Sequence, residues 1–125
     1  MEFRDNQAIY LQIVEYIGEQ VLLKKWLPGE KIASIRELAI TMQVTPNTVQ
    51  RACDFLQQRE IIANKRGIGY FVTGESKEKF LAFRKEQFIE RELPVFFRNI
   101  YVLNMNMEEI GDLYNQFIQS NFKKH

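Results

Sequence analysis

The chain has 125 residues, 46% of them hydrophobic and 26% charged, which gives room for one ordinary domain with a buried core plus a small appended element. Its net charge is only +1, so a nucleic-acid partner must be argued from where the cations lie rather than from their number. One cysteine excludes an intramolecular disulfide, and the chain shows neither a signal pattern nor an apolar run of about 20 residues, so we expect a soluble cytoplasmic protein without a membrane partner.

The first predicted helix covers residues 7–26. Its apolar side chains recur at helical spacing and form one stripe, made of Ile9, Ile13, Val14, Ile17, Val21 and Leu22. Leu27-Pro28-Gly29 then ends the helix and turns the chain.

Two further helices follow, each with its own start signal. Ser34 with Glu37 three residues later has the spacing of a capping box, and Thr45 before Pro46 is a cap followed by proline at the first helical position. Gln43-Val44 is the turn between them. The expected buried faces are Ile35, Leu38, Ala39 and Met42 on one helix, and Val49, Ala52, Cys53 and Leu56 on the other. Two helices joined by so short a turn make a helix-turn-helix.

A β-hairpin is predicted next. Ile61–Ala63 and Tyr70–Val72 have strand composition, and the segment Asn64–Gly69 between them contains two glycines and two cations. Ile32 is a candidate for a third short strand. Helix, turn, helix and basic hairpin are, in this order, a winged helix-turn-helix.

The chain becomes richer in aromatic residues after Glu75. We expect a helix over 76–93, a kink at Pro94, continuing helix over 95–103, and a last helix capped by Asn106. About 50 residues are too few to bury so much apolar surface alone, so a second copy of the chain is the simplest partner. The predicted dimerisation residues are Phe80, Phe83, Phe88, Phe96, Phe97, Ile110, Leu113, Tyr114 and Phe117.

The predicted fold class is therefore mainly α with a small β-wing. Residues 1–74 form an N-terminal winged helix-turn-helix for binding DNA, and residues 75–125 form a short C-terminal α-helical dimerisation region.

The polar face of the third helix carries the candidate DNA contacts. Asn47, Arg51 and Asp54 project away from the apolar stripe, while Thr48 and Gln50 flank it. Asn and Gln bond adenine bidentately, Arg suits guanine or phosphate, and the first turn of a helix offers phosphate donors. Taken singly, each residue also fits a solvated helix face or hairpin tip. Because a basic wing follows the helix, DNA binding is the favoured interpretation of the set. The full predicted set is Ser34, Arg36, Thr45, Asn47, Thr48, Gln50, Arg51, Lys65, Arg66 and Gly67.

Catalysis has little support. The one histidine is the last residue, His125, and Cys53 lies on a predicted buried stripe. No catalytic triad, clustered metal ligands or phosphate-cradling glycine loop is present. We therefore predict no enzyme, no catalytic residues, no metal and no cofactor.

Five segments, in this order and spacing, resemble the GntR family of bacterial transcription regulators: Ile9–Ile13, Pro28–Ile32, Ser34–Ala39, Val44–Val49 and Gly67–Val72. The Pro-Asn-Thr-Val-Gln variant and the short helical tail resemble its YtrA subfamily. That resemblance implies a dimeric repressor paired through its C-terminal helices, often encoded beside ABC transporter genes. It also implies DNA contacts at Arg36, Thr45, Asn47, Thr48, Gln50 and the wing Lys65–Gly67. Many members have Arg where Pro46 and Gln50 stand here, so their base preferences do not transfer.

The function that we expect is a homodimeric repressor that binds an inverted-repeat operator, with a transporter operon as a candidate target. One alternative is a winged helix used for protein interaction, for which binding would depend little on salt. Another is a repressor whose aromatic C-terminal helices enclose a small-molecule effector, which would raise the melting temperature.

Overall fold

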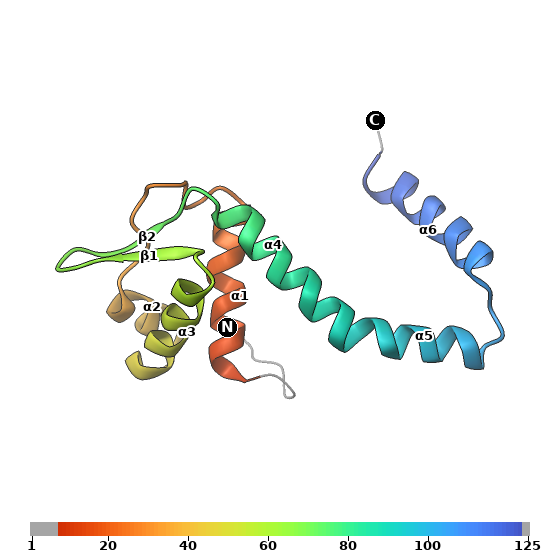
Figure 1. Cartoon of the computed structure of the whole chain (residues 1–125), viewed down its shortest axis with the longest axis horizontal. Helices are drawn as coiled ribbons and strands as arrows, with labels where there is room; N and C mark the ends of the chain where they lie inside the picture. Colours follow the sequence, from red (N-terminus) through yellow and green to blue (C-terminus); the bar gives the residue numbers. More distant parts are fainter. Residues whose placement is uncertain (1–7, 124–125) are drawn as a thin grey trace. The chain divides into compact units, whose positions relative to one another are not determined.

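The computed structural model describes residues 8–123, which form two compact units, one ending at Phe83 and the other beginning at Arg84 (Figure 1). Its elements are α1 (Ile9–Leu22), α2 (Ile35–Met42), α3 (Pro46–Gln58), β1 (Ile62–Lys65), β2 (Gly69–Val72), α4 (Ser76–Gln87), the π-helical turn η1 (Phe88–Glu92), α5 (Leu93–Val102) and α6 (Met107–Asn121). The predicted class, mainly α with a small β-wing, is confirmed. Within residues 8–123 every helix is too short or too polar to span a bilayer.

The two helices of the helix-turn-helix begin where their caps predict. The Ser34 hydroxyl accepts the Glu37 N–H at 3.0 Å, and the Glu37 carboxylate accepts the Ser34 N–H at 2.9 Å, which completes the capping box. The N–H of Ser34, followed by its hydroxyl, holds the pKa of Glu37 below its usual value. Thr45 caps α3 by accepting the Thr48 N–H at 3.3 Å, with Pro46 directly after the cap. Local side-chain chemistry thus sets both helix starts.

The wing is an antiparallel pair of strands, β1 and β2, in which Ile62 faces Val72 and Lys65 faces Gly69. The sequence placed Lys65 and Gly69 in the turn; pairing instead extends both strands to these residues and leaves a turn centred on Gly67, whose φ of +78° suits glycine. The predicted third strand is a single bridge: Lys31 pairs with Phe71, and the Ile32 N–H donates to the Tyr70 carbonyl at 3.0 Å.

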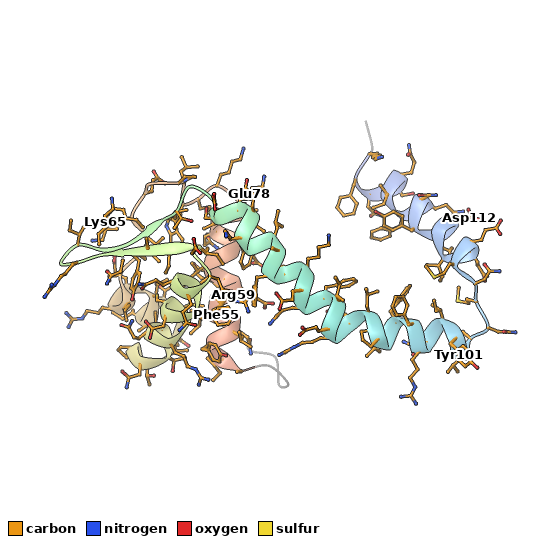
Figure 2. The ribbon with its side chains drawn as sticks, viewed as in Figure 1. Phe55, Arg59, Lys65, Glu78, Tyr101 and Asp112 are labelled. Carbon is orange, nitrogen blue, oxygen red and sulfur yellow. The ribbon has the colours of Figure 1, made fainter. Side chains whose placement is uncertain are left out.

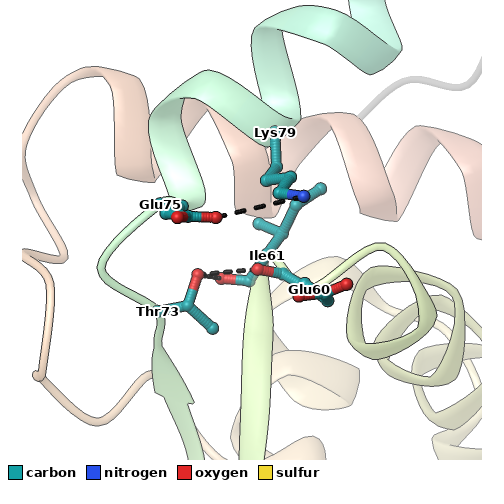
Figure 3. A network of polar contacts seen from close by, with 5 residues as sticks. All are labelled: Glu60, Ile61, Thr73, Glu75 and Lys79. Carbon is teal, nitrogen blue, oxygen red and sulfur yellow. Dashed lines mark hydrogen bonds and ion pairs between the residues drawn. The ribbon is translucent and has the colours of Figure 1, made fainter.

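The base of the wing is tied to the end of α3 by one threonine (Figure 3). The Thr73 hydroxyl, just after β2, donates to the carbonyl of Glu60 at 2.7 Å and contacts that of Ile61 at 3.2 Å. The nearby pair between Lys79 and Glu75, at 3.9 Å, is exposed and contributes little. The start of β1 and the end of β2 are therefore held together where the chain leaves α3.

A single core joins α1, α2, α3, the wing and the first two turns of α4. All the predicted inward residues of α3 are buried, as are Leu38, Ala39 and Met42 of α2. Ile35 of α2 and Leu22 of the α1 stripe are only half-buried, and Ile9 has 46% of its surface exposed.

Phe80 and Phe83 are placed differently from the prediction. We assigned them to dimerisation, but they are 0% and 3% exposed and belong to the core of the first unit. The Phe80 ring lies on Gly18 of α1, and Phe83 makes an edge-on contact with Phe55 of α3 at 5.1 Å between ring centroids. Because α1 and α3 already cover these rings, they are not available to a second chain.

The second unit contains η1, α5 and α6, and no residue of these three elements is buried. The kink predicted at Pro94 takes the form of the wide turn η1 just before it, in which the Leu93 N–H donates to the Phe88 carbonyl. Proline has no N–H for the carbonyl four residues back, so helices kink or widen there. Asn106 caps α6 as predicted, accepting the Glu109 N–H at 2.8 Å.

Candidate nucleic-acid interface

The outer face of α3 presents the predicted polar residues. Asn47, Arg51 and Asp54 are exposed, whereas Thr48 and Gln50 are half-buried at its flank. The opposite face is anchored by Val49, Ala52, Cys53 and Leu56, each fully buried. The core thus fixes the rotation of the helix, and this rotation leaves a polar first turn facing outward.

The start of α3 is occupied by its own cap. The hydroxyls of Thr45 and Thr48 are 2.9 Å apart, and Thr45 also accepts the Thr48 N–H. These hydroxyls hold the first turn in shape. The positive end of the helix dipole then lies beside the exposed Asn47, an arrangement that suits an anion such as phosphate.

The cations differ in how tightly they are held. The Arg51 guanidinium lies 4.0 Å from the ring centroid of Tyr10, and the Lys65 ammonium lies 4.2 Å from that of Phe71. A guanidinium stacked on a ring by its face keeps its N–H edge available for phosphate oxygens. Arg36 and Arg66 are exposed, on the first turn of α2 and in the turn of the wing. Ser34 and Gly67 support these positions as a cap and a turn residue rather than as charges.

Arg59, at the end of α3, takes no part in this surface. Its guanidinium lies over the rings of both Phe55 and Phe83, 4.8 Å from each centroid. Figure 2 shows Phe55 and Arg59 at the side of α3, whereas Lys65 projects from the wing. Arg59 thus packs on aromatic rings, whereas Lys65 and Arg66 of the wing are exposed.

Gln50 makes contacts that connect α3 to the wing. Its amide nitrogen Nε2 donates to Asp54 Oδ1 at 2.9 Å and to the Tyr70 hydroxyl, also at 2.9 Å. The i, i+4 spacing of Gln50 and Asp54 was visible in the sequence, but neither Tyr70 nor Tyr10 was identified there as part of this face. Tyr70 is 20 residues from Gln50, and only the hairpin brings it back.

Cys53 lies in the core beneath this face, and burial raises the pKa of its thiol to about 12, with a smaller contribution from the negative charge of Asp54. Within residues 8–123 no three His, Cys, Asp or Glu side chains are grouped so as to hold a metal ion.

We expect Cys53 to react with an aromatic disulfide reagent at pH 8 at least about 100-fold more slowly in the folded protein than in urea, because attack requires opening of the core. Release of the chromophore measures the rate of this reaction. Equal rates with and without urea would mean that the thiol is accessible.

The raised pKa of Cys53 also makes stability depend on pH. Its contribution to the free energy of unfolding is present below the ordinary thiol pKa and is lost as the pH rises toward 12.

The remaining predicted dimerisation residues lie in the second unit. Ile110 is half-buried, and the rest are exposed apolar side chains: Phe88, Phe96, Phe97, Leu113, Tyr114 and Phe117. Neighbouring rings already contact one another, with centroids 6.0 Å apart for Phe96 and Phe97 and 5.9 Å apart for Phe117 and Phe122. Within one chain these apolar side chains are left uncovered.

Comparisons with known proteins agree with this geometry. The family model described as "Bacterial regulatory proteins, gntR family" matches residues 9–72. Two proteins of Bacillus subtilis are similar over 109 residues, 87% of this chain: the HTH-type transcriptional regulator YhcF, 32% identical over 88% of its length, and the HTH-type transcriptional repressor YtrA, 30% identical over 83%. A GntR-family structure from Bacteroides thetaiotaomicron superposes with a TM-score of 0.80 at 42% identity, covering 90% of this chain and 98% of that one.

Proposed function

Since this chain belongs to the GntR family of bacterial regulatory proteins, and is thus a DNA-binding transcriptional regulator rather than an enzyme, we propose that it acts as a homodimeric repressor of an inverted-repeat operator. The observation that carries this proposal is the outward-facing, polar first turn of α3 beside the cations of the wing. A recognition helix enters the major groove with its N-terminal residues on base edges, and cations beside it bind phosphates.

In this proposal the contacts divide by chemistry. Asn47 and Gln50 read base edges from α3, and Thr45 and Thr48 keep the first turn in the shape that presents them. The phosphate contacts come from Arg36, Arg51, Lys65 and Arg66, with Gly67 allowing close approach of the wing.

The proposal of a dimer rests on the second unit. Its three elements bury none of their residues within one chain, although α5 and α6 carry Phe97 at 48% exposure, Tyr114 at 63% and Phe117 at 57%. A second copy covers such a surface with the same residues, because a twofold interface is self-complementary. We propose residues 84–123 as the dimerisation region and residues up to Phe83 as the DNA-binding domain.

Twofold symmetry sets the form of the operator. Two recognition helices would enter successive major grooves about 34–36 Å apart, so the half-sites form an inverted repeat spaced by one turn of DNA. From the resemblance to the YtrA type, we propose a transporter operon as the target. The name of the relative YtrA describes that protein as a repressor, which supports repression as the mode of action.

The experiment that tests this function is selection of bound fragments of the source genome by the purified protein at about 150 mM salt. Enrichment of an inverted repeat upstream of a transporter operon would support the dimeric regulator, its operator and its target. An inverted repeat elsewhere would support the dimeric regulator and reject the target. No enrichment by a folded, dimeric protein would mean that either an effector is missing or the winged helix serves another partner.

We expect Arg36→Ala to weaken binding about equally on all sequences, because a phosphate contact carries no base information. The slope of log affinity against log salt should become shallower by about one per lost contact, hence about two per dimer. Titration of selected and scrambled DNA at several salt concentrations measures both. Lys25→Ala, which removes an exposed cation after α1, is the matched control and should change neither. A loss confined to the selected sequence would instead make Arg36 a base reader.

A further inference from the structure

The amide of Gln50 is fixed in one orientation by its two partners. Its Nε2 is 2.9 Å from Asp54 Oδ1 and 2.9 Å from the Tyr70 hydroxyl. An ionised carboxylate only accepts hydrogen bonds, so the nitrogen and not the oxygen of the amide must face Asp54. The chemistry of Asp54 thus decides which end of the Gln50 amide is occupied by these two contacts.

This orientation uses both donors of the amide. A glutamine side chain has two N–H groups, and here one goes to Asp54 and the other to Tyr70. What remains to offer to another molecule is the oxygen, Oε1, which only accepts. Bidentate recognition of adenine needs a donor for N7 as well as an acceptor for the N6 amino group. Gln50, held in this way, lacks the donor.

The two partners hold Gln50 from different elements. Asp54 is one helical turn along α3, at the i, i+4 spacing at which Gln and Asp side chains meet. Tyr70 is on β2; its ring is half-buried and packs against the core, and its carbonyl accepts the Ile32 N–H. A half-buried ring on a paired strand has little freedom, so the hydroxyl of Tyr70 is a fixed acceptor rather than a chance contact.

We propose that Tyr70 and Asp54 are positioning residues that make Gln50 an acceptor-only reader of DNA bases. This inference rests on the proposed function, since it concerns how the same face reads its operator. In the major groove, adenine and cytosine present an amino donor, N6 or N4, whereas guanine and thymine present acceptors at the corresponding positions. Gln50 therefore accepts either amino base and rejects the two others.

The test is selection from a pool of random double-stranded DNA by the full-length chain and its variants. Gln50→Ala identifies the base position that the side chain reads, because the preference at that position disappears. At that position the wild type should enrich adenine and cytosine to a similar degree. Tyr70→Phe removes only the acceptor hydroxyl and frees one N–H, so adenine should gain over cytosine by about 5-fold to 150-fold.

Two further variants complete the comparison. Asp54→Ala frees the other N–H and should move the same position toward adenine. Tyr16→Phe removes the hydroxyl of a tyrosine of α1 that lies outside the Gln50 network, and it should leave every preference unchanged. A merely structural role of Tyr70 would weaken binding on all sequences without this shift.

A measurement on the free protein, without DNA, separates the inference about Gln50 from the proposed function. In the free protein, the NMR signals of the Gln50 side-chain amide should show bonded protons, and Tyr70→Phe should shift one of them. Signals typical of a free amide would overturn the inference while leaving the regulator intact. Three results of the DNA selection would also overturn the inference: a wild-type preference for adenine alone at the position that Gln50 reads, an unchanged preference at that position in Tyr70→Phe, or no position whose preference disappears in Gln50→Ala. No enriched motif for any variant would overturn the proposed function itself, and the inference with it.

Discussion

Replacing Phe80 by alanine is expected to lower the free energy of unfolding by about 3–5 kcal/mol, because a fully buried ring leaves a cavity that the surrounding core cannot close. The ring belongs to α4, yet it lies on Gly18 of α1. Urea denaturation of the full chain at one fixed protein concentration measures the loss, since the stability of a dimer depends on concentration.

Leu81→Ala is the matched control. Leu81 is the next residue of α4 and is 46% exposed, so its truncation should cost well under half as much. If Phe80→Ala lowered the free energy of unfolding no more than Leu81→Ala does, α4 would not belong to the folded core of the first unit. The boundary of the DNA-binding domain would then return to residue 74.

Gly18 should be the complementary site. A Cβ added to it would clash with the Phe80 ring, so Gly18→Ala forces the ring out of place at a cost of about 1–3 kcal/mol. This cost exceeds the gain of up to about 1 kcal/mol in helix propensity. In a chain that already carries Phe80→Ala, the same substitution should be neutral or stabilising. That change of sign in a double-mutant cycle would establish the contact directly.

The second large effect is on DNA affinity, which should fall by about 10⁴ when salt rises from 50 to 200 mM. The face offers four exposed cations per protomer, Arg36, Arg51, Lys65 and Arg66, hence eight per dimer. If each releases a counterion from a phosphate, log affinity falls against log salt with a slope of roughly −7. The net charge of +1 does not oppose this, because the Debye length is only about 10 Å at 0.1 M salt and local cations dominate.

Removing the cations of the wing should flatten this dependence. Lys65→Ala combined with Arg66→Ala removes four of the eight, so the slope should become roughly −4. Lys25→Ala combined with Lys77→Ala removes the same charge from exposed positions outside the interface and should leave the slope unchanged. A slope near zero for the unmodified protein would reject DNA as the partner and favour a protein-binding winged helix.

Much of the fold could be predicted from the sequence because its signals are local. The Ser34–Glu37 box, the Thr45 cap before Pro46 and the Asn106 cap all start helices where the chain predicts them. A cap needs only residues within one turn of each other. Helical spacing likewise identified the buried face of α3, and with it which side chains of that helix face outward.

Contacts between distant elements could not be read in this way. A pattern of apolar spacing shows that a face is covered but not by what, and so Phe80 and Phe83 were assigned to a second chain although α1 and α3 cover them. The Tyr70 hydroxyl accepts a hydrogen bond from Gln50 only because the hairpin returns β2 to the helix. Helix starts and the polar face of α3 follow from neighbouring residues, so the chain's own pattern was enough to place them. The exposure of each aromatic ring and the partners of the Gln50 amide depend on elements far apart in the chain, so they could be known only from the folded structure.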